Sequence, residues 1–103
     1  MSVLMEFAMF PTDKGESVSE YVSKVIKMIS ESGYEYQLTA MGTIIETETF
    51  DQALEILSKS HSILEPVSNR ISSNVKFDIQ KKKKNRISGK IKSIVDKIGN
   101  VNT

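Results

Sequence analysis

The chain has no cysteine and no tryptophan, and only two of its 103 residues are proline. Without cysteine it can form no disulfide bond, no thiol-based catalytic site and no cysteine metal site. It also lacks an apolar run long enough to span a membrane, and residues 1–6 have neither the basic start nor the apolar stretch of a secretory signal. We therefore expect a cytosolic protein without a membrane partner.

The motifs of several enzyme classes are also missing. His61 is the single histidine, so no histidine pair exists to hold a metal, and there is no HExxH, P-loop or GxGxxG pattern. His61 could act as a ligand or a base, but its place in an apolar helical stripe favours a packed side chain that is hydrogen-bonded to the backbone. We expect no enzyme activity, no metal and no cofactor.

The charges are divided along the chain. Residues 1–69 carry 4 lysines against 11 acidic residues, a net charge of −7, whereas residues 70–103 carry 10 basic residues against 2 aspartates, a net charge of +8. One interpretation is a basic tail that binds an anionic partner such as nucleic acid. The other, which we favour, is a basic strand and helix beside acidic elements of the same chain or of a symmetry mate, because such blocks usually form solvated faces.

Four segments have the alternation of β-strands. Residues 3–11 alternate between apolar and other side chains and end at Pro11. Residues 34–41 and 43–48 predict two strands joined by a turn at Met41–Gly42, where glycine tolerates a positive φ. Residues 71–80 predict a fourth strand.

Three segments have helical periodicity. Ser17 and Glu20 have the spacing of a capping box, and the helix after them should end near Gly33; its stripe is Val18, Tyr21, Val22, Val25 and Ile29. Thr49 and Gln52 form a second capping box before the stripe Phe50, Ala53, Leu54, Leu57, His61 and Leu64, and Pro66 marks the end of that helix or the loop after it. A short final helix closed by Gly99 is indicated by Ile87, Ile91, Ile94, Val95 and Ile98.

This order, β-α-β-β-α-β followed by an extra C-terminal helix, predicts an α+β, ferredoxin-like fold with a four-stranded antiparallel sheet. We expect one domain over residues 1–99 and a frayed tail over 100–103. One face of the sheet should pack on two helices and carry Val3, Met5, Phe7, Met9, Tyr36, Leu38, Ile45, Val75, Phe77 and Ile79. The other, open face should carry Leu4, Glu6, Ala8, Phe10, Gln37, Thr39, Met41, Ile44, Glu46, Asn74, Lys76 and Asp78.

The open face mixes apolar groups with carboxylates, which is typical of a subunit interface, a ligand pocket or both. Glu46 could pair there with a cationic or amino-bearing ligand, and Thr43 could add a hydroxyl. From the residues alone, a surface glutamate on a strand is the favoured interpretation of Glu46.

The run Lys81–Lys84 could hold a phosphate, but a flexible, solvated loop is the favoured interpretation. An RNA-binding member of this fold would need aromatic and basic side chains on its central strands. The matching strand here, residues 43–48, instead carries two acids that would repel a phosphate backbone. We do not expect nucleic acid as a partner.

The sequence also resembles a known family. A first strand that ends in proline, Ser19-Glu20-Tyr21-Val22, Tyr34-Glu35-Tyr36, Ala40-Met41-Gly42-Thr43, Ile45-Glu46 and a lysine-rich final helix are together similar to the small thiamine-binding, ferredoxin-like proteins of the YkoF-like superfamily. The resemblance covers most of the chain. Two features depart from it: Thr12-Asp13-Lys14-Gly15 stands in place of a Gly-Thr-Gly type loop, and Thr47 in place of a glycine after the glutamate.

The resemblance implies a non-catalytic binder of thiamine, or of its hydroxymethylpyrimidine part, at the open sheet face or a subunit interface, assembled as a homodimer or homotetramer. Glu46 and Thr43 are then the first expected ligand residues and Glu6 the next. Further hydrogen bonds would come from Thr39 and Gln37, with Phe10 or Met41 covering the ring. The alternative is a regulatory or structural module whose open face only makes oligomers.

Overall fold

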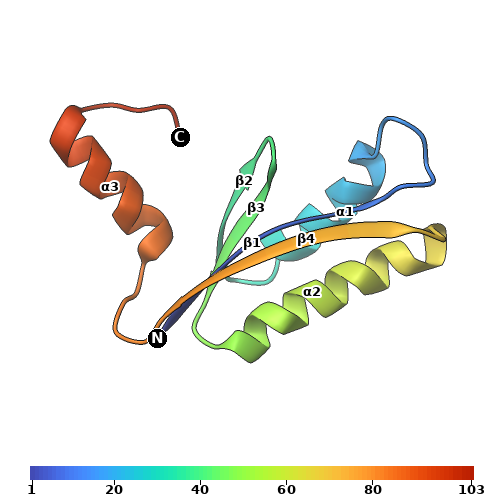
Figure 1. The fold of residues 1–103 in the computed structure, drawn as a ribbon, viewed down its shortest axis with the longest axis horizontal. Helices are drawn as coiled ribbons and strands as arrows, with labels where there is room; N and C mark the ends of the chain where they lie inside the picture. Colours follow the sequence, from blue (N-terminus) through green and yellow to red (C-terminus); the bar gives the residue numbers. More distant parts are fainter.

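Strand β1 (Ser2–Pro11) lies inside the sheet, because its alternate residues are apolar and both of its edges are paired. It pairs antiparallel with β3 (Gly42–Thr47) on one side and with β4 (Ile71–Gln80) on the other. Strand β2 (Glu35–Thr39) pairs with β3, which gives the order β2-β3-β1-β4 (Figure 1). The computed structural model describes residues 1–103 and confirms the predicted α+β, ferredoxin-like fold.

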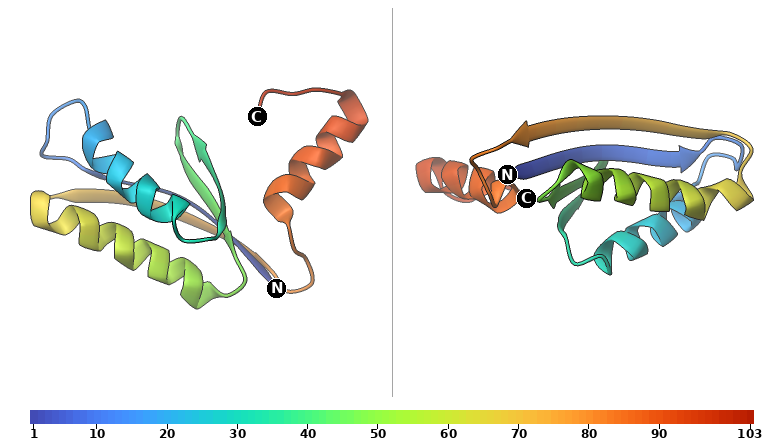
Figure 2. Two further views of the ribbon diagram at one scale, coloured as in Figure 1. Left: turned by 180° about the vertical axis from the view of Figure 1, so that it is seen from behind. Right: turned by 90° about the horizontal axis from the view of Figure 1, so that it is seen from below.

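The three helices are α1 (Ser19–Ser30), α2 (Phe50–Leu64) and α3 (Arg86–Ile98), and a short 3₁₀ turn, η1 (Glu65–Val67), follows α2. Figure 2 shows α1 and α2 side by side on one face of the sheet and the other face uncovered. Helix α3 stands beyond one end of the strands, apart from that two-layer body. No helix of the chain is long and apolar enough to cross a membrane.

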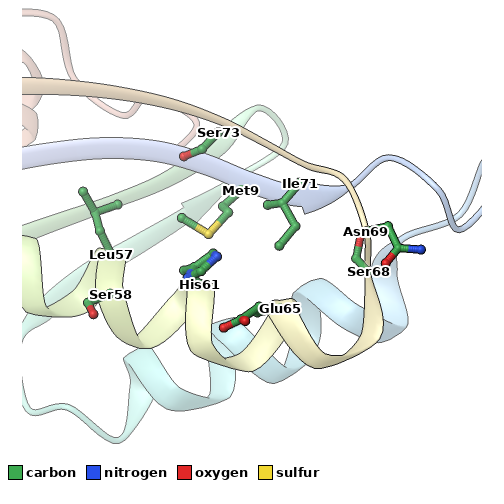
Figure 3. Close-up of a pocket in the computed structure, with 9 residues that line it drawn as sticks. All are labelled: Met9, Leu57, Ser58, His61, Glu65, Ser68, Asn69, Ile71 and Ser73. Atoms are coloured by element: carbon green, nitrogen blue, oxygen red, sulfur yellow. The ribbon is translucent and has the colours of Figure 1, made fainter.

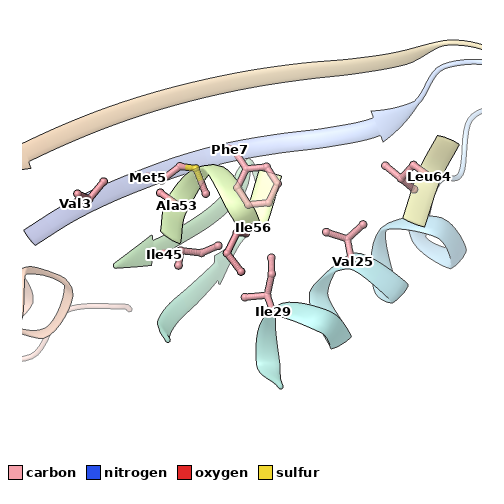
Figure 4. Close-up of a cluster of buried hydrophobic side chains, with 9 residues drawn as sticks. All are labelled: Val3, Met5, Phe7, Val25, Ile29, Ile45, Ala53, Ile56 and Leu64. Carbon is pink, nitrogen blue, oxygen red and sulfur yellow. The ribbon is translucent and has the colours of Figure 1, made fainter. Parts of the chain in front are cut away.

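The register fixes which side chains share a face. Met5 lies opposite Ile45 and Phe77, and Phe7 lies opposite Thr43. These residues point toward α1 and α2, where nine buried side chains form the core: Val3, Met5, Phe7, Val25, Ile29, Ile45, Ala53, Ile56 and Leu64 (Figure 4). Leu4 lies opposite Glu46 and Asp78 on the open face.

Four residues predicted for the core lie on the helix-covered side but are exposed: Tyr36, Leu38, Val75 and Ile79. They belong to the two edge strands, which the helices cover only in part: α2 packs mainly on β1 and β3 and contacts β4 through the Phe50–Phe77 ring pair. The stripe predicted for α2 was correct in part: Ala53 and Leu64 are buried and Leu57 packs against the core, but Phe50 and Leu54 are exposed, and the buried face also includes Ile56 and Ser60. The Ser60 hydroxyl is satisfied by donating to the Ile56 carbonyl at 2.7 Å.

One of the two predicted capping boxes is present. Thr49 accepts a hydrogen bond from the Gln52 N–H at 3.2 Å, and the Gln52 side chain accepts from the Thr49 N–H at 3.1 Å. The Ser17–Glu20 box was wrong. Helix α1 begins after Val18 without a side-chain cap, so Glu20 is only the second helical residue and lies one position too early to reach back.

The prediction of a positive φ at Gly42 was wrong. Gly42 is required for a different reason. It is the first residue of β3, and a Cβ there would lie 2.9 Å from the Phe7 carbonyl oxygen. The glycine therefore permits β3 to approach β1 closely. Positive φ occurs instead at Gly33 and Gly99, the residues predicted to end α1 and α3.

Candidate functional site

A cavity of about 280 Å³ lies between α1 and the β2–β3 hairpin. We call it the hairpin pocket. Residues 7–10 of β1 and 38–43 of the hairpin line it, together with Val18, Val22, Val25 and Ile26 at the start and middle of α1. Most of these side chains are apolar and none is charged. The pocket therefore suits a small, largely uncharged molecule that makes a few hydrogen bonds.

Beside the pocket, the last residues of β1, Ala8–Pro11, have no partner strand on the β3 side. Pairing with β3 stops at Phe7, whereas pairing with β4 continues to Pro11. The Phe7 carbonyl faces Gly42 of β3, and the Thr12 N–H donates to Arg70 on the β4 side at 2.8 Å. Because backbone groups alternate between the two edges of a strand, the N–H and C=O of Met9 point toward the unpaired edge. They offer one donor and one acceptor beside the pocket.

Thr43 and Thr39 supply the hydroxyl groups of the pocket, but only one of them is free. The Thr39 hydroxyl donates to the Gly42 carbonyl at 2.8 Å and accepts from the Met41 N–H at 3.2 Å, so it shapes the hairpin turn. Thr43 is buried beneath the pocket and its hydroxyl makes no hydrogen bond within the chain. Thr43 is therefore the side chain best able to bond a ligand there.

Glu46 lies on the opposite side of the sheet from Thr43, since the two differ by an odd number of strand positions. Its Oε2 accepts from the Ser2 hydroxyl at 2.6 Å and from the Arg86 N–H at 3.0 Å, and its Oε1 accepts from the Ile87 N–H at 3.1 Å. Glu46 thus caps the first turn of α3, where the helix dipole favours a negative charge. This structural use of Glu46 was not predicted.

Burial alone would raise the pKa of Glu46. The hydrogen bonds from the Arg86 N–H, the Ser2 hydroxyl and the Ile87 N–H outweigh burial and hold its pKa below the ordinary value of 4.5. The carboxylate is therefore charged at neutral pH.

The buried guanidinium of Arg86 completes this cluster. Its Nε donates to the Ser2 hydroxyl at 3.0 Å, and its Nη2 donates to the Ser2 carbonyl at 2.9 Å and to the Asp78 carbonyl. Its Nη1 lies 3.2 Å from an Asp78 carboxylate oxygen without hydrogen-bond geometry. We call Ser2, Glu46, Asp78 and Arg86 the α3 clasp, because together they fix the start of α3 to β1, β3 and β4.

Two predicted ligand residues, Glu6 and Gln37, lie elsewhere on the open face. Glu6 is exposed between Ile44 and Lys76, at two shallow hollows of about 200 Å³ each. Gln37 lies across from Ile44 on the edge strand β2 and lines the space between β2 and α3. Neither side chain reaches the hairpin pocket.

A second, larger hollow of about 580 Å³ lies between the C-terminal half of α2 and the start of β4 (Figure 3). His61 points into it from α2, toward Met9 and Ile71. The expectation of a packed, hydrogen-bonded histidine was wrong: the α2 stripe that contains His61 faces this hollow, so His61 is exposed and makes no hydrogen bond within the chain. No group of three potential metal ligands occurs here or elsewhere.

Of the seven predicted ligand residues, the hairpin pocket brings together four: Phe10, Thr39, Met41 and Thr43. Sequence reasoning missed Met9 and the α1 side chains. Met9 contributes its backbone N–H and C=O, and backbone groups are the same for every residue type. The α1 side chains that line the pocket have the same apolar spacing as side chains that face a core, so the sequence does not distinguish the two. Sequence reasoning also missed Arg86, because an arginine close to the lysine run Lys81–Lys84 gives no sign that it is buried.

Comparison with known proteins agrees with the fold and the resemblance. The model of the family described as "Thiamine-binding protein" matches residues 5–95. UPF0045 protein MJ1052 of Methanocaldococcus jannaschii is 35% identical over 92 residues, covering 89% of this chain and 91% of that protein. UPF0045 protein YqgV of Bacillus subtilis is 33% identical over 82 residues, covering 76% of this chain and 79% of its own.

Solved structures share the architecture. The crystal structure of MJ1052 has a TM-score of 0.80 at 34% identity and covers 90% of this chain and 95% of its own. A candidate thiamine biosynthesis/salvage protein from Thermotoga maritima has a TM-score of 0.78 at 19% identity and covers 91% of this chain and 99% of its own, a likeness of fold alone. The matched family is named for binding rather than for a reaction. This chain belongs to the thiamine-binding protein family, whose members include the UPF0045 proteins.

Proposed function

We propose that the protein is a non-catalytic binder of thiamine, or of its hydroxymethylpyrimidine part, and that the aminopyrimidine ring occupies the hairpin pocket. Family membership supports the ligand class. Among the hollows of the chain, the hairpin pocket best fits a flat, uncharged ring, because apolar side chains surround a few polar groups.

The observation that carries this proposal is the unpaired edge of β1 at Met9 beside the free hydroxyl of Thr43. An aminopyrimidine has an amino donor next to a ring-nitrogen acceptor, and the C=O and N–H of one strand residue form the complementary pair. Thr43 can make a further hydrogen bond from beneath the ring. Each of these bonds contributes about 0.5–1.5 kcal/mol.

The size and charge of the pocket limit what it can hold. A volume of about 280 Å³ lies at the small end of ligand sites, so one ring system fills it. No lysine or arginine lines it to pair with a phosphate, and burying an unpaired charge is costly. The thiazolium part of thiamine, and any phosphate attached to it, would therefore lie at the mouth of the pocket. The threonine hydroxyls and backbone groups of the pocket can form hydrogen bonds with a ligand, but they do not supply an acid or a base for a reaction.

Calorimetric titration with thiamine and with hydroxymethylpyrimidine tests the proposal. We expect both to bind the wild-type chain, and Val22→Phe, which adds volume on the pocket wall, to weaken both by at least about tenfold. Val67→Phe is the matched control, since Val67 is exposed on η1 outside the pocket. Binding that survives Val22→Phe unchanged, or no binding of either compound by the wild type, contradicts the proposal.

The variant Glu46→Gln tests on which face of the sheet the ligand binds. If the ligand occupies the hairpin pocket, this variant keeps most of its affinity, because Glu46 lies on the other face and its oxygens already accept three hydrogen bonds. Loss of binding in Glu46→Gln with retention in Val22→Phe would move the ligand to the open face.

We also propose that the protein self-associates as a dimer or tetramer. Large apolar side chains remain exposed on both edge strands and on α3, among them Leu38, Ile79 and Ile98. Such surface in a chain of 103 residues is typical of a subunit interface. Light scattering at several concentrations tests this, and a mass that stays at 11.6 kDa throughout would contradict it.

A further inference from the structure

The hollow between the C-terminal half of α2 and the start of β4 combines apolar and polar side chains (Figure 3). We call it the His61 hollow. Three half-buried apolar side chains, Met9, Leu57 and Ile71, line it together with six polar residues. Its volume of about 580 Å³ lies within the range of small-molecule sites. It is separate from the hairpin pocket, with which it shares only Met9.

The space exists because β4 carries a small side chain where a core residue would fit. Ser73 lies opposite Met9 in the register and on the helix-covered side of the sheet, two positions after Ile71. A larger side chain at this position would fill the gap between the sheet and α2. The serine leaves it open.

Five polar side chains of the hollow make no hydrogen bond within the chain: Ser58, His61, Glu65, Asn69 and Ser73. Together they offer both donors and acceptors. The carboxylate only accepts, whereas the carboxamide, the imidazole and the two hydroxyls can each donate and accept. The hollow therefore presents a varied set of polar groups beside an apolar surface.

The sixth polar residue, Ser68, helps to fix the loop that carries Asn69. The Asp13 carboxylate accepts from the Ser68 hydroxyl at 2.6 Å and from the Asn69 N–H at 2.7 Å. These bonds hold the pKa of Asp13 below its ordinary value of 3.8, so the carboxylate stays charged at neutral pH. Asp13 belongs to the segment 12–15, where the chain departs from the family pattern. The loop is thus fixed before any ligand arrives.

The mixture of groups limits the class of ligand. No lysine or arginine lines the hollow and Glu65 is its one carboxylate, so the hollow disfavours an anion. An ammonium group would pair with Glu65, but it only donates and would leave the donors of Asn69 and His61 without an acceptor. A neutral molecule with several hydroxyls both donates and accepts, and its C–H groups can lie against the apolar side chains.

We infer that the His61 hollow binds a neutral, polyhydroxylated ring, such as the ring of a monosaccharide. The Glu65 carboxylate accepts hydrogen bonds from the hydroxyls of the ligand, and hydrogen bonds to a charged group are the stronger class. The side chains of Asn69 and His61 bond the remaining hydroxyls, and the ring packs on the apolar lining. The inference goes beyond the proposed thiamine site and does not depend on it.

NMR titration of the isotope-labelled protein with D-glucose, D-galactose, D-mannose and D-ribose tests the inference. We expect at least one of these sugars to bind at millimolar concentration and to shift the amide signals of Asn69 and Ser73. The variant Ser73→Leu fills the hollow and should abolish these shifts. Ser72→Leu is the matched control, because Ser72 is the neighbouring residue and points to the other face of the sheet.

Glu65→Gln tests the carboxylate directly. We expect it to weaken the binding of the sugar by about tenfold. Glu55→Gln is its control, since Glu55 is exposed on α2 outside the hollow. Both Ser73 and Glu65 are exposed, so the variants should keep the far-UV circular dichroism of the wild type.

Three results would overturn the inference. One is a wild-type chain that binds none of these sugars. Another is a sugar that binds the wild type, Ser73→Leu and Glu65→Gln equally well, because the ligand would then lie elsewhere. The third is binding of spermidine, titrated in parallel, in place of a sugar, which would make the hollow a site for an organic cation.

Discussion

The backbone N–H of Arg86 donates to the carboxylate of Glu46 at 3.0 Å, which joins the start of the last helix to a central strand forty residues earlier. This bond makes Glu46 an anchor for α3. The sequence did not predict this role, because a glutamate in a strand gives no sign of a distant helix start.

Replacing Glu46 by alanine should destabilise the protein by about 1–3 kcal/mol, because two helix N–H groups and the Ser2 hydroxyl lose their acceptor. Urea unfolding followed by circular dichroism measures this. Glu48→Ala is the control, since Glu48 directly follows the same strand and is exposed. Equal midpoints for the two variants would show that the clasp contributes nothing to stability.

Acid should release the clasp. The pKa of Glu46 is lowered on folding, so its contribution to stability is present above its ordinary value of 4.5 and is lost as pH falls through the folded value. We expect the unfolding free energy of the wild type to fall below about pH 4.5 more steeply than that of Glu46→Gln. Parallel pH profiles of the two proteins would contradict this.

Two glycines form a matched pair for backbone tests. Gly42→Ala should cost about 1–3 kcal/mol, because the added Cβ meets the Phe7 carbonyl oxygen at 2.9 Å. Gly89→Ala should instead stabilise by about 0.5–1 kcal/mol, because it lies inside α3 with no atom near the new methyl group. Thermal unfolding of both variants checks the opposite signs, and a shift in the same direction would argue against the close approach of β3 to β1.

Thr43→Val should weaken the binding of hydroxymethylpyrimidine by about tenfold, because it removes the free hydroxyl of the hairpin pocket with almost no change in volume. Calorimetric titration measures this loss. Thr47→Val is the control on the same strand face: its hydroxyl donates to the Thr49 carbonyl at 2.8 Å outside the pocket, so it should lower stability and leave affinity unchanged. If the two variants bind equally well, Thr43 does not contact the ligand.

The elements of the fold were predictable because their signals are local. Alternation in residues 3–11 and 71–80, and the Thr49–Gln52 capping box, depend on neighbours within a few positions. The errors fell where a local signal competed with tertiary packing. Val75 and Ile79 have a core pattern but lie at positions of an edge strand that α2 leaves exposed, and Ser17 precedes a helix that begins later than its cap signal indicates.

The candidate site was predictable only in part. Thr43, Thr39, Phe10 and Met41 could be nominated because they surround one turn and one strand end that are close in the sequence or adjacent in the sheet. Thr43 and Glu46 were predicted to bind the ligand together, but they do not form one site, because residues at odd spacing in a strand point to opposite faces of the sheet. Whether either residue contacts thiamine stays a prediction.

The sequence by itself determined the order of the strands and helices, the family and the two faces of each strand, since periodicity and residue type carry that information. Only the tertiary structure decided where β1 lacks a partner, which acceptor Arg86 and Ile87 use, and which apolar residues stay uncovered. The physical reason is that strand ends, helix docking and burial depend on groups distant in the chain, whose meeting is fixed by packing and not by local preference.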